Sequence, residues 1–269
     1  MKQYPHYARL QAHALIISHR HRFIFMHCRK AAGSSIAACL APFLGPEDLH
    51  LGTWPEAFEQ GVAPNRRARR DLLHPMAAAS FAYRLLRRPG QLNDRSYRIE
   101  ALNGAQRLKY RTPLGRSPEH AHAADVHALF PKAWRDYFKF CFVRNPFDRA
   151  VSDYVWRTRK TGNADMTFSD FLQRLYQRDF SNRTIPRHFD NWPIYTIDGR
   201  IEVDYVGRFE RLGNDLDEVF ARLGLQHPPL AHAKGMQRTG SYHDWYGEDE
   251  RGVVERLFAN EIRQFGYGF

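Results

Sequence analysis

Three polar side chains near the N-terminus, those of Lys30, Ser34 and Ser35, could hold an anion, because they flank a tight loop of small residues, 31–33. An apolar run, 23–26, precedes the loop, and apolar residues recur at helical spacing after it. This order predicts a strand, a loop and a helix. Backbone N–H groups of such a loop and the positive end of the helix dipole both favour a bound anion. We therefore predict an anion site at this junction.

The order of these residues differs from the nucleotide-binding pattern GxxxxGK[ST], in which Lys follows the last Gly and a hydroxyl follows Lys to hold Mg²⁺. In this chain Lys30 precedes Gly33, and the hydroxyls come after the glycine. The pattern fits an anion held without an obligatory metal. An ordinary strand-to-helix turn with a surface lysine and a capping serine explains the stretch equally well, so a second site is needed to decide.

Arg144 and Ser152 form a second candidate site at another strand-to-helix boundary. Asn145 and Pro146 mark the start of the helix, and Asp148 stands where a capping-box acid would. Ser152 then lies roughly 10 Å along the helix, within reach of a long arginine side chain. A guanidinium and a hydroxyl together suit a phosphate monoester. The alternative is that Arg144 pairs with Asp148 and Ser152 is an ordinary helical serine.

Histidines gather just before this second boundary, in the HxH pair His120 and His122 and in His127. No carboxylate or cysteine accompanies them at a familiar metal-ligand spacing, so we expect no metal site. A histidine placed in a cleft can instead take up a proton near neutral pH. A third apolar segment, 205–210, also ends in charged residues, among them Arg208, and a helix from Asn214 follows it.

These three units predict the fold, because open α/β sheets bind ligands at the carboxyl ends of their strands. We predict an α/β fold with a P-loop-like parallel sheet flanked by helices, in one domain over 1–269. Residues 46–118 are expected to form an irregular insertion, with helical pieces around 54–58 and 77–86. Further expected elements are an edge strand or lead-in at 15–17, an amphipathic helix over 167–176, and one closing helix over 249–265.

Composition indicates a globular protein with a basic surface. The formal charge of +11 favours anionic partners, among them nucleic acid, acidic lipid, acidic polysaccharide and a phosphorylated cofactor. Cys28, Cys39 and Cys141 are expected to be core thiols, because their spacing suggests neither disulfides nor zinc. No apolar run is long enough to span a membrane, and residues 1–11 lack a signal-peptide core. We expect a cytoplasmic protein and leave membrane association open.

The motifs around Lys30 and Arg144 resemble those of a known family. The stretch Lys30-Ala31-Ala32-Gly33-Ser34-Ser35 resembles the 5′-phosphosulfate loop of sulfotransferases that use 3′-phosphoadenosine 5′-phosphosulfate, and residues 142–152 resemble their 3′-phosphate motif. The likeness is closest to Golgi-type carbohydrate sulfotransferases and their bacterial relatives, over 23–36 and 118–269. Arg29 stands where the family usually has Pro, and Ser34 where Thr is more usual. The missing Golgi anchor points to a bacterial-type cytosolic enzyme.

The resemblance implies an in-line transfer of a sulfuryl group to a hydroxyl of the acceptor, with 3′-phosphoadenosine 5′-phosphate as product and no metal required. The acceptor it suggests is a glycan or a glycolipid. His120 is the preferred base, with His122 as the alternative. Lys30 is expected to stabilise the leaving phosphate. The cofactor-binding residues implied are Arg29, Lys30, Ala32, Gly33, Ser34 and Ser35 at the 5′ end, Arg144 and Ser152 at the 3′-phosphate, and Arg208 at either.

Two other classes remain as alternatives. A P-loop kinase-like phosphotransferase needs a hydroxyl directly after its lysine, and residue 31 is Ala. A basic nucleic-acid-binding protein would use the arginine clusters at 66–70 and 84–88, and its binding would weaken steeply with salt. We expect no nucleic-acid partner. The sequence predicts neither the oligomeric state nor the role of the insertion.

Overall fold

The computed structural model describes residues 14–226 and 240–269, and the contacts divide these residues into two units. The first, called the sheet unit, contains the described residues 14–143 and 191–226; the second, the helical unit, contains 144–190 and 240–269. The single domain over 1–269 stays a prediction. Residues 1–11, on which the signal-peptide argument rests, lie outside the described residues.

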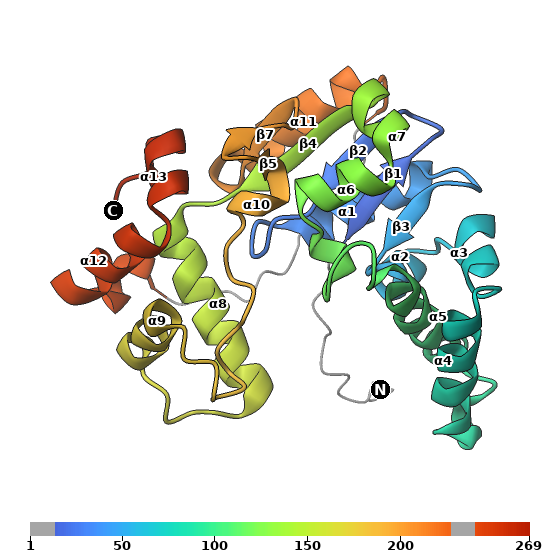
Figure 1. The fold of residues 1–269 in the computed structure, drawn as a ribbon, viewed down its shortest axis with the longest axis horizontal. Coiled ribbons are helices and arrows are strands. Elements are labelled where there is room, and N and C mark those ends of the chain that lie inside the picture. The colour runs from blue at the N-terminus through green and yellow to red at the C-terminus, as the bar shows by residue number, and fades with distance from the viewer. Residues whose placement is uncertain (1–13, 227–239) are drawn as a thin grey trace. The chain divides into compact units, whose positions relative to one another are not determined.

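The sheet unit is built on five strands in the order β3-β1-β2-β4-β7 (Figure 1). β4 is parallel to both β2 and β7, so the carboxyl ends of these three strands meet at one edge, as predicted. β1 is antiparallel to both of its neighbours, so the predicted parallel sheet is a mixed one. The strands are β1 Leu15–Ser18, β2 Phe23–Met26, β3 Leu49–Leu51, β4 Phe138–Val143 and β7 Tyr205–Arg208.

Residues 15–17, expected as an edge strand or a lead-in, form the strand β1, which is not at the edge because β3 pairs outside it. All four residues of β2 are at most 1% exposed, which fits a strand covered on both faces. The three cysteines are buried, as predicted. Around the sheet lie helices α1 Gly33–Leu40, α6 Ala123–Leu129, α7 Pro131–Asp136, α10 Trp192–Tyr195 and α11 Leu212–Arg222, and the small hairpin of β5 Thr196–Ile197 and β6 Arg200–Ile201.

The insertion is largely helical, so the expectation of an irregular segment is wrong. Its helices are held by an apolar cluster that includes Trp54, Ala68 and Leu102. A buried polar chain adds to it, because the indole of Trp54 donates to Gln106, which in turn donates to Asp71. Two of the helical pieces were predicted. The helices are α2 Trp54–Glu59, α3 Arg66–Asp71, α4 Pro75–Leu86 and α5 Arg95–Tyr110.

The helical unit contains α8 Pro146–Thr161, α9 Phe168–Gln177, α12 Glu248–Leu257 and α13 Ala259–Phe265. Two predicted helix starts are confirmed, because Asn145 accepts the N–H of Phe147 and Thr167 accepts the N–H of Asp170. The predicted single closing helix is wrong, since Phe258 breaks it with φ −123° and ψ 27°. The guanidinium of Arg149, from α8, lies over the ring of Phe258. Within the described ranges no helix is long and apolar enough to cross a membrane.

Candidate functional site

The loop between β2 and α1 has an unusual backbone. Lys30 and Ala32 both adopt positive φ, 62° and 60°, although neither is glycine. Such conformations are costly, of order 1–3 kcal/mol each, and persist where the surrounding structure enforces them. Left-handed residues in a tight turn direct successive N–H groups toward one point. Ala32 is also the N-cap residue of α1, and an alanine side chain cannot accept the helix's first N–H groups. This backbone is compatible with the predicted anion site, and anion binding stays a prediction.

Gly33 is required by a close packing contact. A Cβ atom at this position would lie 1.9 Å from ring atoms of His27. His27 is buried, and its Nδ1 accepts the backbone N–H of Ala14 at 2.5 Å. Burial, with a smaller effect of the Arg29 charge, lowers the pKa of His27 to about 3, so this ring is neutral at physiological pH. The neutral ring of His27 therefore packs against Gly33 and fills the space that a side chain there would need.

His120 lies against the same loop. Its Nδ1 is 2.7 Å from the carbonyl oxygen of His27, and the two rings are 4.8 Å apart. A carbonyl oxygen can only accept, so Nδ1 carries the proton and Nε2 of the neutral ring is the basic nitrogen. His120 is 5% exposed, whereas His122 is exposed at the N-cap position of α6. This geometry favours His120 over His122 as a base, and the role itself stays a prediction.

The side-chain amide of Asn191 holds this loop. The sequence patterns did not indicate this residue. Its Oδ1 accepts the backbone N–H of Arg29 at 2.9 Å, and its Nδ2 donates to the Arg29 carbonyl at 3.1 Å. Asn191 is fully buried. It precedes the Trp192-Pro193 start of α10, where asparagine commonly caps a helix, but its side chain does not cap α10. The sequence Asn-Trp-Pro thus indicates a helix start at this position but does not indicate the contact with Arg29.

Arg208 ends β7, beside Val143 of β4 in the sheet register. Its backbone N–H donates to Asp215 at 2.6 Å. The preceding Gly207 is also required by packing, because a Cβ there would lie 2.4 Å from the ring of Phe142. Because β7 is parallel to β4 and β4 is parallel to β2, Arg208 lies at the same edge of the sheet as the Lys30 loop, as predicted.

In the helical unit, Arg144 lies just before the N-cap of α8, and Ser152 lies within the helix. The guanidinium of Arg144 contacts Asp148 through Nε at 2.7 Å and Nη2 at 2.6 Å. Asp148 thus pairs with Arg144 rather than completing a capping box, which was the alternative interpretation. A guanidinium has five N–H donors, so a carboxylate partner does not exclude a phosphate as well. The phosphate-binding role of Arg144 and Ser152 stays a prediction.

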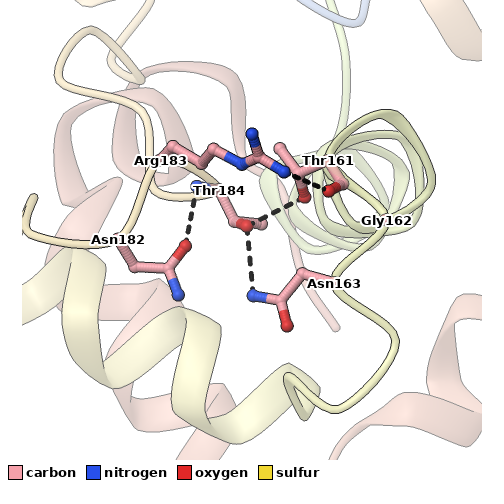
Figure 2. Close-up of a pocket in the computed structure, with 6 residues that line it drawn as sticks. All are labelled: Thr161, Gly162, Asn163, Asn182, Arg183 and Thr184. Atoms are coloured by element: carbon pink, nitrogen blue, oxygen red, sulfur yellow. Dashed lines mark hydrogen bonds between the residues drawn. The ribbon is translucent and has the colours of Figure 1, made fainter.

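A shallow polar pocket lies at the other end of α8, lined by residues 161–163 and 182–184 (Figure 2). Its groups bond to one another: the hydroxyl of Thr184 meets Thr161 at 2.9 Å and Asn163 at 3.2 Å. None of the predicted site residues lines it. The pocket therefore adds nothing to the candidate site.

A model of the sulfotransferase family matches residues 13–267 of the chain. The chain belongs to the sulfotransferase family. Carbohydrate sulfotransferase 14 of Danio rerio is 32% identical over 123 residues, which cover 35% of this chain and 32% of that protein. Carbohydrate sulfotransferase 12 of Xenopus laevis is 25% identical over 227 residues, 62% of this chain and 52% of that protein. This chain thus spans about a third to a half of these curated relatives.

An uncharacterized protein of Archaeoglobus fulgidus is 31% identical over 94 residues, 35% of this chain and 73% of that protein. No solved structure matches the chain. In this sulfotransferase the sheet unit brings His120 to His27, at the start of the loop between β2 and α1. The helical unit separately contains Arg144, just before α8, and Ser152, within it. Among the described residues, no cluster of His, Cys, Asp and Glu is placed to hold a metal ion.

The arginines of the first cluster of this sulfotransferase contact other groups of the same chain, although Arg66 and Arg70 lie on the surface. Arg66 and Arg70 both pair with Glu47, at 2.5 and 2.7 Å. Arg67 donates to the Tyr110 hydroxyl at 2.8 Å, and Arg69 donates to the Pro64 carbonyl. Each of these arginines thus has a partner within the chain, and Glu47 partly neutralises the charge of Arg66 and Arg70.

Proposed function

We propose that this sulfotransferase transfers a sulfuryl group from 3′-phosphoadenosine 5′-phosphosulfate to a hydroxyl of a carbohydrate or glycolipid acceptor. The observation that carries the proposal is the backbone of the Lys30 loop, whose two left-handed residues and uncapped helix start suit the 5′-phosphosulfate. The similarity to two carbohydrate sulfotransferases supports a carbohydrate acceptor.

The proposed roles follow the chemistry of the displacement. The bond between sulfur and the 5′-phosphate oxygen breaks, and a bond between sulfur and the acceptor oxygen forms. Lys30 stabilises the charge that develops on the leaving phosphate oxygen. His120 takes the proton of the acceptor hydroxyl at Nε2, since its Nδ1 proton is held by the carbonyl of His27.

The remaining predicted residues bind the donor. Gly33, Ser34 and Ser35 hold the 5′-phosphosulfate through backbone and hydroxyl donors, with Arg29 and Ala32 shaping the loop. Arg144 and Ser152 bind the 3′-phosphate, because a guanidinium and a hydroxyl suit a phosphate monoester. Arg208 supports either phosphate.

A labelled donor tests the proposal. The protein is incubated with donor carrying radioactive sulfate and a panel of unsulfated glycans and glycolipids, and label in the acceptor fraction is measured. We expect transfer to at least one acceptor, a loss of about 10²-fold or more in Lys30→Ala, and no loss in the exposed control Lys132→Ala. Equal transfer by wild type and Lys30→Ala would remove the proposed role of Lys30, and no labelled acceptor would contradict the carbohydrate assignment.

A further inference from the structure

The helix α4 exposes an apolar face to solvent. Of its 12 residues only Ala77 is buried. Met76, Tyr83 and Leu86 are 51%, 62% and 73% exposed, and Leu73, just before the helix, is 80% exposed. Residues 76, 79, 83 and 86 fall on one side of a helix, and residue 79 is an exposed alanine. These residues define the α4 face.

This face differs from ordinary exposed apolar residues. Single exposed leucines are normal in soluble proteins, whereas an apolar stripe along a helix usually packs against a partner. The side of α4 toward Ala77 and Phe81 already packs against the protein, so the exposed stripe is a second apolar side. Figure 1 shows α4 and α5 side by side, extending away from the sheet. The stripe is thus presented on a projecting hairpin.

Positive charge surrounds the α4 face. Residues 72–99 contain five arginines and one acidic residue, Asp94. Arg87 lies on the same side of the helix as Met76 by spacing, and its guanidinium is 5.9 Å from the ring centre of Tyr83. Arg88 lies 5.9 Å from the ring centre of Tyr97. Both arginines are exposed.

We propose that the α4 face docks on a lipid bilayer surface that carries negative charge. Apolar side chains of a helix lying in the interface enter the boundary between headgroups and acyl chains, and arginines reach the lipid phosphates. A tyrosine suits this boundary because its ring is apolar and its hydroxyl is polar. A second copy of the chain fits less well, since pairing two α4 faces would bring together two segments that each carry an excess of arginine. This inference does not depend on the sulfotransferase activity.

Flotation of the full chain with vesicles tests the proposal. We expect binding to vesicles of phosphatidylcholine mixed with phosphatidylglycerol, little binding to phosphatidylcholine alone, and weaker binding as NaCl is raised. The variant Met76→Gln, Tyr83→Gln, Leu86→Gln should lose about tenfold or more in vesicle affinity, because its α4 face is polar while helix propensity is kept.

The matched control is Leu129→Gln, Tyr176→Gln, which removes exposed apolar residues elsewhere, 37% and 47% exposed. It should bind vesicles like wild type, and circular dichroism should show both variants folded. Equal binding to neutral and charged vesicles, or wild-type binding by the α4 variant, would overturn the proposal. So would a dimer in sedimentation velocity without lipid that the α4 variant converts to monomer.

Discussion

The side-chain amide of Asn191 brackets the backbone of Arg29 from 162 residues away, accepting its N–H and donating to its carbonyl. This pair fixes the chain one residue before Lys30 enters its left-handed conformation. Because the loop geometry is costly, a buried contact from outside the loop is needed to maintain it.

Replacing Asn191 by Ala is therefore expected to weaken donor binding as well as stability. Two backbone groups of Arg29 lose their buried partner, which costs about 1–3 kcal/mol in the free energy of unfolding. We expect the dissociation constant for 3′-phosphoadenosine 5′-phosphate, measured by calorimetry, to rise about tenfold. Asn103→Ala is the control, because Asn103 is buried and bonds only to Gly52 O, at 3.2 Å, among the hydrogen bonds described. A donor affinity unchanged in Asn191→Ala would contradict a positioning role.

Gly33→Ala should destabilise the protein through its contact with His27. The added Cβ has no space beside the buried ring, and overpacking costs about 1–3 kcal/mol in urea unfolding. Gly213→Ala is the control, since nothing lies within 4 Å of a Cβ there. The double variant His27→Ala, Gly33→Ala should lose less stability than the sum of the two single variants. Additive losses would show that the two positions are not coupled.

His120→Ala and His122→Ala should differ in turnover. Loss of the base is expected to lower kcat about 10²- to 10⁴-fold with the glycan that the labelled-donor assay identifies. His122→Ala should stay close to wild type, because its side chain is exposed and His120 keeps its bond to His27. Calorimetry should show both variants binding the spent donor normally. The reverse order of losses would assign the base to His122.

Glu56 should make stability depend on pH. Burial, with smaller contributions from Glu59 and Glu100, raises the pKa of Glu56 to about 7 from 4.5. The folded state then binds a proton that the unfolded state has released, so this group's contribution to stability is lost as pH rises from about 4.5 to 7. The shift corresponds to at most about 3 kcal/mol. The free energy of unfolding of wild type minus that of Glu56→Gln, measured in urea, should therefore fall from pH 4.5 to pH 7, whereas the titration of His27, which acts in the opposite direction, is common to both proteins. The same difference taken with Glu59→Gln should change less.

Elements with local signals could be predicted from the sequence. The run of apolar residues in β2, the Asn145-Pro146 start of α8 and the Thr167 cap of α9 each depend on neighbours in the chain. The helix α5 was missed because buried polar residues, Asn103 and Gln106, interrupt its apolar spacing. Their burial depends on partners in other segments of the chain, and the spacing of apolar residues gives no information on such partners.

The candidate site also contains residues that the local sequence indicates and one that it does not. The residues of the Lys30 loop and the boundary at Arg144 were predicted because their type and spacing are typical of an anion site, and their binding roles stay predictions. Asn191 was not found, since its role depends on a contact with Arg29 that only the folded chain creates. The pairing of Arg144 with Asp148 was considered as an alternative, because residues four apart on a helix are neighbours.

The most direct test of donor recognition is calorimetry with 3′-phosphoadenosine 5′-phosphate and adenosine 5′-phosphate, on wild type, Arg144→Ala and Arg157→Ala. Arg157, within α8, is a matched control, because it pairs with Asp153 at 2.8 Å with 18% of its side chain exposed, against 14% for Arg144. We predict binding that requires the 3′-phosphate, collapses in Arg144→Ala and survives in Arg157→Ala. Equal binding of both nucleotides, or no binding by wild type, would contradict the proposed donor.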